Sequence, residues 1–352
     1  MRRASQFGRR PTIIDVAIAA GVSKSTAARV MSGQGNVSPK VVAAVRTASR
    51  DLGYQRNNMA VSMRSGRSGL IGIIVPDISN PFWAEVVRGA QERAVLSGSS
   101  LLIFSSDWSA ERERSHLQAL VQTRVDGFVL NTIADEGDTQ DFTNLGCPFV
   151  LIGTTSDLYP DRSSVGSDIP QGVATALDHL SRCGHDLPKL ITGPPRRLAR
   201  AKFVSAINRY FIDRDIDPTG IEAENGEYSV NGGRAAMARL IRHHKGSHMT
   251  VFAANDLMAL GAMAEARDAG LACPADVSVI GFDGIPSGEF CSPPLTTIAK
   301  PSRGIGEDAM RLLGRLIEGD SVVMRPRLPC RLVERGSVLD FSATRERTLH
   351  LA

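Results

Sequence analysis

Three side chains that can donate hydrogen bonds to a nucleic acid lie close together near the N-terminus. Lys24, Ser25 and Arg29 fall on one side of a predicted helix, and Ala27 and Val30 form its apolar side. Lysine and arginine bind phosphates and guanine edges, and a serine hydroxyl can reach several bases. The spacing therefore predicts a short helix that packs on one side and presents a DNA-binding surface on the other.

Neighbouring residues predict the elements that hold this helix. Thr12 and Asp15 can form a capping box at the start of a preceding helix, and Gly21 can end it. Ser23 can cap the polar-faced helix, and a third helix is predicted to begin after Ser38. The inward side chains of the third helix are expected to be Val41, Val45, Ala48 and Leu52. Such a trio is typical of a helix-turn-helix, whose second helix lies in the major groove. The alternative is an ordinary helical hairpin with a solvated basic face.

The charge distribution favours the DNA-binding interpretation. The whole chain has a formal net charge of only +4. Residues 1–67, however, contain 12 Lys and Arg against two Asp, whereas the remaining 285 residues contain 29 basic and 35 acidic side chains. A basic head on an acidic body is expected of a module that binds a polyanion, joined to a part that does not.

Length and cysteine content limit the remaining classes. A chain of 352 residues with 42% hydrophobic residues can bury a sizeable core in more than one domain. Five scattered cysteines without CxxC spacing indicate reduced thiols in a cytoplasmic protein. The charged N-terminus is not followed by an apolar segment, so we expect neither a secretory signal nor a membrane span. No metal or cofactor is expected, and we find no nucleophile elbow, P-loop or dinucleotide fingerprint that would indicate an enzyme.

From residue 70 onward, short apolar runs alternate with amphipathic helical segments. Strands are predicted at 70–75, 101–104, 127–130, 149–152, 250–253 and 277–281, and helices lie between them, for example at 82–98 and 109–124. Continuous apolar runs of this length are typical of parallel strands buried on both faces. The pattern predicts an α/β body with two doubly wound parallel-sheet subdomains behind the all-α helix-turn-helix headpiece.

Ligands of open α/β sheets bind beyond the carboxyl ends of the strands. The segments at those positions are PDISNPFW and SSDW after the first two strands, and ANDLMALG and FDGIPS near the end. They are rich in aromatic, amide and carboxylate side chains. We therefore expect a site for a small polar molecule that presents a face for stacking.

The chain resembles the lactose/galactose repressor (LacI/GalR) family of bacterial transcriptional regulators from about Thr12 to Val338. The stretches that carry the resemblance are TIIDVAIAAGVSKSTAARVM, GLIGIIVPDISNPFWAEVVRGAQE, RVDGFVL, ANDLMALGAM, DVSVIGFDGIP and PPLTTI. The resemblance implies a DNA-binding headpiece fused to a body like that of periplasmic sugar-binding proteins. The implied parts are a headpiece at 11–56, a hinge helix at 57–67, a body at 68–340 (first subdomain about 68–169 and 300–325, second about 170–299 and 326–340) and a tail at 341–352.

The resemblance also implies roles in DNA binding. Lys24, Ser25 and Arg29 would contact bases, and the residues expected at phosphates are Ser23, Thr26 and Asn36. The hinge helix would begin at Asn57 and carry Ala60 and Met63 on the face toward the minor groove, with Met63 in place of the family's usual leucine wedge. Arg56 replaces the usual proline before this helix.

For the effector site, the resemblance implies that Phe82, Trp83 and Tyr228 stack on the ligand. Asn255 and Asp283 would bind its hydroxyl groups, and Asp256 is expected to cap the helix that follows. Two positions differ from the family. Phe203 stands where an arginine usually binds the effector, unless a one-residue shift brings Lys202 there, and Gly153 replaces an aspartate. These differences predict a ligand with another polar pattern than the family's simple sugars.

Together these expectations describe a homodimeric bacterial repressor in the cytoplasm. It would bind palindromic operator DNA with an affinity controlled by a small-molecule effector, a sugar or sugar derivative, between the two subdomains. The tail has no leucine heptads, which favours a dimer over a tetramer. The alternative is a solute-binding protein for transport, which the basic headpiece and the missing signal disfavour. Whether the effector releases or recruits DNA does not follow from the sequence.

Overall fold

The computed structural model describes residues 11–33, 36–54, 67–133, 145–244 and 248–342. The chain divides into two compact units, Met1–Ser68 and Gly69–Ala352. We call the first unit the headpiece and the second the body. Within the described ranges, no helix has both the length and the apolar character needed to cross a membrane.

The headpiece consists of three helices, α1 (Ile13–Ala19), α2 (Lys24–Ser32) and α3 (Pro39–Asp51). The predicted capping box is present, because the backbone N–H of Thr12 donates to the Asp15 carboxylate at 2.7 Å and the backbone N–H of Asp15 donates to the Thr12 hydroxyl at 3.4 Å. The buried side chains that join the helices are Val16, Ala17, Ala27, Val30, Val45 and Ala48. Leu52, expected to face inward, is 38% exposed because it follows the last turn of α3.

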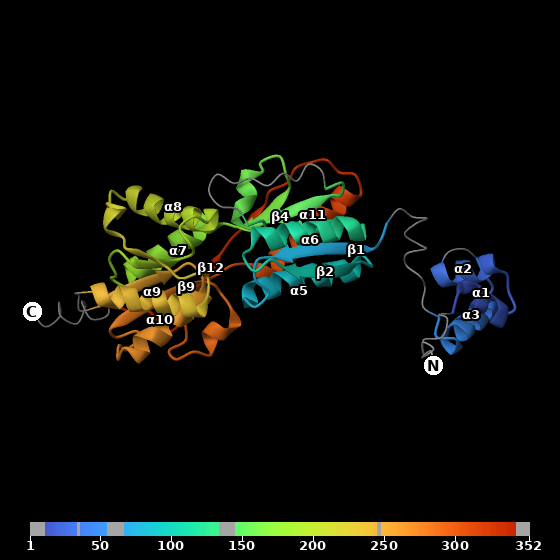
Figure 1. Ribbon diagram of the computed structural model, residues 1–352. Helices are drawn as coiled ribbons and strands as arrows, with labels where there is room; N and C mark the ends of the chain where they lie inside the picture. The colour runs from blue at the N-terminus through green and yellow to red at the C-terminus, as the bar shows by residue number, and fades with distance from the viewer. Residues whose placement is uncertain (1–10, 34–35, 55–66, 134–144, 245–247, 343–352) are drawn as a thin grey trace, which may run out of the picture. The chain divides into compact units, whose positions relative to one another are not determined.

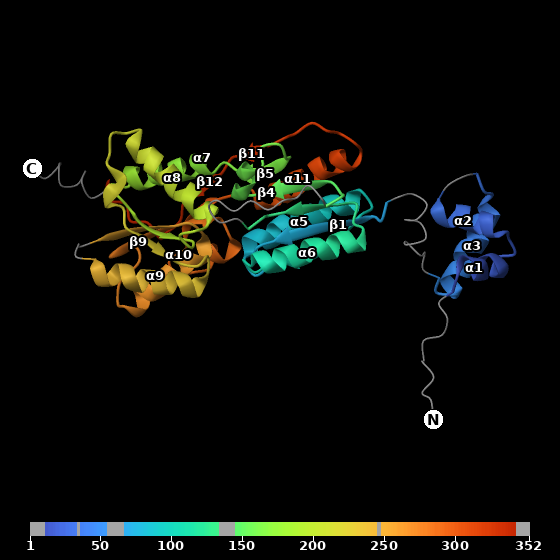
Figure 2. The same cartoon turned by 45° about the horizontal axis from the view of Figure 1, so that its top comes forward.

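The body contains two sheets, which define its two lobes (Figure 1, Figure 2). The first lobe has the strand order β11-β5-β4-β3-β1-β2, and all its neighbouring strands are parallel. Its elements are β1 (Leu70–Val75), α5 (Pro81–Leu96), β2 (Ser100–Ser105), α6 (Ala110–Thr123), β3 (Gly127–Leu130), β4 (Phe149–Ile152), η1 (Thr154–Leu158), β5 (Ser164–Ser167), α11 (Ser302–Ile317) and β11 (Arg327–Leu328).

The second lobe has the order β12-β10-β9-β8-β6-β7, with β12 antiparallel to β10 and the other pairs parallel. Its elements are α7 (Ile169–Arg182), β6 (Lys189–Thr192), α8 (Leu198–Ile212), η2 (Pro218–Gly220), β7 (Ala223–Asn225), α9 (Val230–His243), β8 (Met249–Ala253), α10 (Asp256–Asp268), β9 (Val277–Asp283), η3 (Pro286–Glu289), β10 (Thr296–Ala299) and β12 (Arg331–Val333). The two doubly wound sheets agree with the predicted fold class.

Alternating residues of each strand explain why helices cover both faces of the first sheet. Ile71 and Ile73 belong to the core under α5 and α11, whereas Ile74 packs with Leu117 and Leu120 of α6 on the opposite face. The predicted strand at 101–104 lies in β2, an edge strand. It is less buried than expected, and its Ile103 is 46% exposed.

The chain passes between the lobes three times: between β5 and α7, between β10 and α11, and between β11 and β12. The third passage lies a few residues later than the expected boundary near 325–326. Arg327 and Leu328 still pair with β5 of the first lobe, because the extended backbone there continues the first sheet by two more residues.

Candidate ligand cleft and DNA-contact surface

The outer face of α2 is accessible, as a DNA-contact surface requires. Lys24, Ser25 and Arg29 are exposed, whereas Ala27 and Val30 are buried against α1 and α3. Asn36 is also exposed. In the part of this unit that the structure describes, this face of α2 therefore presents the three side chains that the sequence analysis assigned to base contacts.

Ser23 organises the start of α2. Its hydroxyl accepts the backbone N–H of Thr26 at 3.1 Å and lies 2.8 Å from the Thr26 hydroxyl and 2.9 Å from the Ser25 hydroxyl. The cap is as predicted. The expected hinge residues Asn57, Ala60 and Met63, with Arg56 before them, lie outside the described residues.

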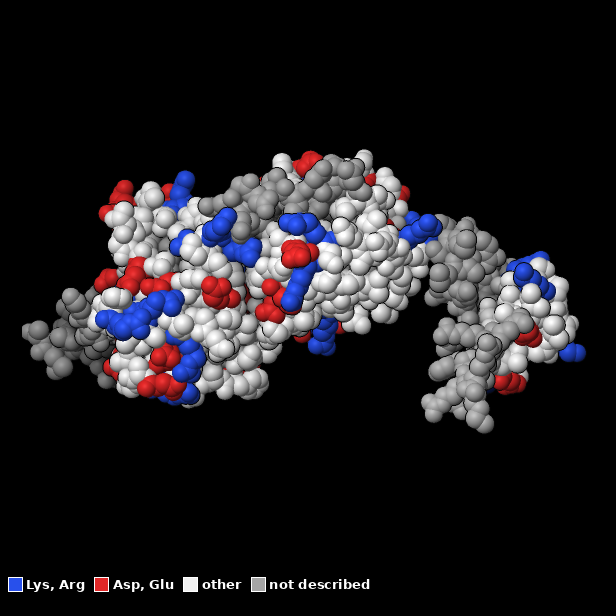
Figure 3. All heavy atoms as spheres, in the orientation of Figure 1, with Lys and Arg blue, Asp and Glu red and all other residues white. Residues whose placement is uncertain are grey.

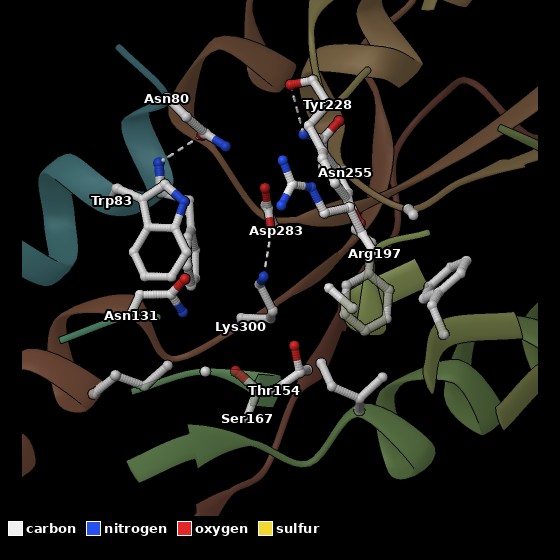
Figure 4. Close-up of a pocket in the computed structure, with 18 of the residues that line it drawn as sticks. Asn80, Trp83, Asn131, Thr154, Ser167, Arg197, Tyr228, Asn255, Asp283 and Lys300 are labelled. Atoms are coloured by element: carbon white, nitrogen blue, oxygen red, sulfur yellow. Dashed lines mark hydrogen bonds and ion pairs between the residues drawn. The ribbon is translucent and has the colours of Figure 1, made fainter. Parts of the chain in front are cut away.

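A cavity of about 120 Å³ lies between the two lobes of the body (Figure 4). Side chains from both lobes line it. Five of the residues predicted from the sequence are among them: Phe82, Trp83, Tyr228, Asn255 and Asp283. Segments as far apart in the chain as Phe82 and Asp283 thus meet at one site, as expected for the carboxyl ends of two parallel sheets.

The start of α5 positions the first two aromatic rings. Asn80 caps the helix by accepting the backbone N–H of Phe82 at 3.0 Å, and Pro81 occupies the first turn. The rings of Phe82 and Trp83 lie edge to face, with their centroids 4.9 Å apart. Both are mostly buried, so packing fixes their orientation toward the cavity.

Tyr228 of the second lobe stacks on Trp108 of the first lobe. Their ring centroids are 4.7 Å apart and the rings are inclined by 14°. Trp108 follows β2 in the segment SSDW, which the sequence analysis placed beyond a strand end without assigning the tryptophan a role. Burial raises the pKa of the Tyr228 phenol above its ordinary value, so the hydroxyl is neutral and can donate a hydrogen bond.

Asn255, rather than Asp256, caps α10. The Asn255 side chain accepts the backbone N–H of Met258 at 2.8 Å and donates to the Tyr228 carbonyl at 3.1 Å, which fixes the amide beside the cavity. Asp256 is instead fully buried and accepts hydrogen bonds from the Thr297 hydroxyl and the Ile285 N–H. The cap prediction for Asp256 was wrong, because the amide one position earlier already satisfies the helix end.

Two carboxylates lie close together at the carboxyl end of β9. Burial, with the nearby Asp283 as a second cause, raises the pKa of Asp256 to about 7. Burial also raises the pKa of Asp283, while Lys300 opposes the shift. The Lys300 ammonium lies 2.6 Å from Asp283 Oδ1 and 3.7 Å from the centre of the Phe82 ring. The sequence analysis missed Lys300, although it directly follows β10 and comes two residues after the family stretch PPLTTI.

Phe203, not Lys202, lines the cavity. The Phe203 ring packs edge to face on Phe252 and Phe282 at 5.0 and 5.5 Å. Lys202 is not among the lining residues; it donates to the Thr154 carbonyl at 2.7 Å and pairs with Asp157. The structure thus places Lys202 at a contact between the lobes, outside the cavity.

The surroundings of Gly153 leave no space for the side chain of the aspartate that is usual in the family. A Cβ atom at this position would lie 2.3 Å from the Asn131 amide nitrogen, and the backbone has φ +83°. Asn131 donates to the Ile152 carbonyl at 2.8 Å and itself lines the cavity. The amide of Asn131, directly after β3, therefore occupies the space of the carboxylate that is usual in the family.

Arg197 provides a cation that the sequence analysis did not assign. It precedes α8, lines the cavity and donates from Nη2 to the Trp108 carbonyl at 2.8 Å. The feature of the sequence that could have identified Arg197 is the basic segment PPRRLAR, in which it lies. Within the described ranges, no group of three or more metal-ligating side chains is found.

Two family models match the chain. Residues 12–57 match the model described as bacterial regulatory proteins, lacI family, and residues 177–338 match a periplasmic binding protein-like domain. The ribose operon repressor of Escherichia coli is 32% identical over 338 residues, which cover 93% of this chain and 99% of the repressor. The transcriptional repressor CytR of Escherichia coli is 32% identical, with 93% and 96% covered, and the regulator DegA of Bacillus subtilis is 29% identical, with 92% and 97% covered.

Solved structures agree with these matches. A lac repressor dimer bound to operator and the anti-inducer ONPF is 27% identical with a TM-score of 0.82, covering 94% of this chain and 100% of that one. A LacI family regulator from Enterococcus faecium with bound ribose is 27% identical with a TM-score of 0.68, covering 77% of this chain and 99% of that one.

Proposed function

Since this chain belongs to the lacI family of bacterial regulatory proteins, we propose that it is a repressor whose operator affinity is controlled by a sugar or sugar derivative bound between the lobes of its body. The observation that supports this most is the convergence of Phe82, Trp83, Tyr228, Asn255 and Asp283 on one cavity. Aromatic faces beside amide and carboxylate groups suit a ring that carries hydroxyl groups.

The headpiece supplies the DNA contact. Two copies of α2 in a homodimer enter successive major grooves of a palindromic operator. Lys24, Ser25 and Arg29 contact base edges, and Ser23, Thr26 and Asn36 contact phosphates. The segment with Asn57, Ala60 and Met63 forms the hinge helix at the minor groove. A regulator of this kind works in the bacterial cytoplasm, where the operator is.

The body supplies the control. Ligand binding favours one arrangement of the two lobes, which alters how the two headpieces are held on the operator. Because the coupling is a free energy shared by both sites, operator DNA changes the effector affinity by the same factor as the effector changes the operator affinity. The solved relatives with ribose and with operator DNA are consistent with both halves of this proposal.

A gel shift with the DNA upstream of the protein's own gene cluster tests the DNA half. A thermal-shift screen of sugars, sugar acids and nucleosides, repeated on Trp83→Ala and Asp283→Ala, tests the ligand half. We expect a compound that raises the melting temperature of the wild type and of neither variant. A compound that stabilises all three proteins equally would place the effector site elsewhere.

A further inference from the structure

A buried carboxylate lies behind one wall of the cavity. Charged side chains of both signs are exposed on the face of the body that Figure 3 shows, whereas Glu113 of α6 is 0% exposed. The described residues that line the cavity do not include Glu113. Removing a carboxylate from water is costly unless hydrogen bonds or opposite charges compensate the loss. The burial of Glu113 therefore indicates a specific role for its oxygens.

Both oxygens of Glu113 accept hydrogen bonds from the segment that follows β3. The Thr132 hydroxyl donates to Oε1 and the Ile133 backbone N–H donates to Oε2, each at 2.8 Å. Thr132 and Ile133 line the cavity, as does Asn131 directly before them. We call residues 131–133 the wall segment. A side chain from another element thus holds two of its three residues.

The first turn of α6, which contains Glu113, closely follows Trp108. The Glu113 backbone N–H donates to the carbonyl of Ser109, the residue that caps the helix, at 3.0 Å. Ser109 comes directly after Trp108, whose ring belongs to the stack across the cleft. Asp107 and Trp108 have φ values of 47° and 58°, which are unfavourable for residues with a side chain. The turn that carries Trp108 therefore depends on neighbouring contacts.

The side chain of Glu113 joins the ends of two strands that are not neighbours. α6 follows β2 and the wall segment follows β3, and β1 lies between these two strands in the sheet. The N–H of Ser106, after β2, donates to the Val75 carbonyl of β1 at 2.9 Å. The N–H of Asn131, after β3, donates to the Ile74 carbonyl of β1 at 3.0 Å. Those bonds hold the strand ends, and the Glu113 bonds extend this order to the residues that line the cavity.

From these contacts we infer that Glu113 is a positioning residue of the cleft, which sets ligand affinity by holding the wall segment against the turn of Trp108. The inference rests on the proposed function, because it concerns the same cavity. A wall that is already ordered adds no ordering cost when a ligand binds, so hydrogen bonds behind the contacting residues increase affinity. Loss of the Glu113 acceptors leaves buried donors of the wall segment without these partners, and the segment shifts.

Tryptophan fluorescence of the full-length protein tests the inference without any ligand. The chain contains two tryptophans, Trp83 and Trp108, and both line the cavity. Acrylamide quenching of their emission therefore reports on the cleft. We expect Glu113→Met, which removes both acceptors, to raise the quenching constant. Glu113→Gln keeps the length of the side chain and one acceptor oxygen, so it should raise the constant less.

Isothermal titration with D-ribose, a monosaccharide of the class that the proposed function names, measures the effect on binding. We expect Glu113→Met to weaken D-ribose binding about tenfold, the scale set by leaving a buried donor unpaired. Glu113→Gln should lie between this variant and the wild type. If Glu113→Met does not fold, as its melting curve will show, the comparison of Glu113→Gln with the wild type decides.

Two control variants separate positioning from other effects. Leu117→Ala removes a buried side chain from the same helix, which lowers stability, but Leu117 is not one of the described lining residues. Glu111→Gln removes an exposed carboxylate from the same first turn, and with it any effect of charge at the start of the helix. Both controls should retain the quenching constant and the D-ribose affinity of the wild type.

Wild-type quenching in both Glu113 variants overturns the inference, whether or not D-ribose binds. A loss of D-ribose affinity in Leu117→Ala as large as that in the Glu113 variants overturns it as well, because stability alone would then explain the loss. If D-ribose changes operator affinity equally in the wild type and in both Glu113 variants, the proposed function stands while the inference fails. D-ribose binding that depends on Glu113 but leaves operator affinity unchanged would support the inference and contradict the proposed control of DNA binding.

Discussion

The indole of Trp108 and the phenol ring of Tyr228 stack across the cleft, 4.7 Å apart, although they belong to opposite lobes. Arg197 of the second lobe also donates to the Trp108 carbonyl. The short segment after β2 therefore makes two contacts with the other lobe beside the cavity. These contacts stabilise the arrangement of the lobes in which the cavity is lined from both sides.

Trp108→Ala should weaken effector binding. Aromatic pairs contribute about 0.5–1.5 kcal/mol beyond their buried area, which corresponds to roughly a twofold to tenfold loss of affinity. Isothermal titration measures the loss. Trp108→Phe retains a stacking ring and should bind more like the wild type. Equal affinities for wild type and Trp108→Ala would show that the stack does not support the ligand-bound arrangement.

Asp157→Asn should also weaken effector binding, although Asp157 does not line the cavity. Asp157 of the first lobe pairs with Lys202 of the second lobe, and also with Arg325 and Arg327, just before and at the start of β11. The surface pair Asp308–Arg311 lies within α11, so Asp308→Asn is a matched control that should leave affinity unchanged. A loss of the same size in both variants would contradict a role for Asp157 between the lobes.

The pH dependence of this effect follows from the pKa of Asp157. Burial alone would raise it, but Lys202 and Arg327 hold the pKa of Asp157 below its ordinary value of 3.8. A lowered carboxyl pKa means that the contribution is present above about pH 4 and is lost as the pH falls through the lower value. The difference between wild type and Asp157→Asn should therefore be constant from pH 6 to pH 8.

Asp256 should make the body less stable as the pH rises. Its pKa is raised to about 7, first by burial and then by Asp283, so the protonated form is favoured in the folded state. The stabilisation is fully present below the unfolded pKa near 4 and is lost as the pH rises through about 7. Burial lowers the pKa values of His179 and His185, which act in the opposite direction only at lower pH.

Calorimetry of the wild type and of Asp256→Asn between pH 6.5 and pH 8.5 separates this effect from those of Asp283, Cys273 and Cys330, whose pKa values burial also raises. We expect the melting temperature of the body to fall by about 1–3 °C over that range. Asp256→Asn, which cannot ionise, should show a flatter dependence. A wild-type melting temperature that rises over this range would contradict the assignment.

Arg29→Ala should weaken operator binding by about 1–3 kcal/mol and binding to random DNA much less, if Arg29 contacts a guanine. Fluorescence anisotropy at fixed salt measures both, because the phosphate contribution depends on ionic strength. Lys40→Ala removes an exposed cation from α3 and serves as the control, with similar changes on both DNAs. Equal losses on both DNAs for Arg29→Ala would indicate a phosphate contact only.

The helix caps and buried strands that were predicted correctly depend on residues close together in the sequence. The Thr12–Asp15 capping box, the Ser23 cap and the apolar runs of β1, β3 and β4 are determined by neighbouring residues, and the structure confirms them. The five cavity residues followed from the resemblance and from their positions after strand ends. These features depend on short segments whose geometry is largely independent of the rest of the chain.

Contacts between distant segments account for what the sequence did not predict. Whether position 202 or 203 faces the cavity depends on the rotation of α8 against the second sheet, which the packing of Phe203 on Phe252 and Phe282 decides. Lys300 and Arg197 line the cavity because the two lobes meet there, and this arrangement does not follow from their local sequence. The burial of Asp256, which the sequence analysis expected to cap α10, likewise depends on Thr297 and Ile285, which come from other segments.

The most direct test of the central claim measures operator affinity of the full-length dimer with and without a saturating cleft ligand, in the wild type and in Trp83→Ala. The account predicts that the ligand changes the operator Kd of the wild type, that operator DNA changes the ligand Kd by the same factor, and that the effect is lost in the variant. An operator Kd that is the same with and without a ligand bound in the cleft would contradict it.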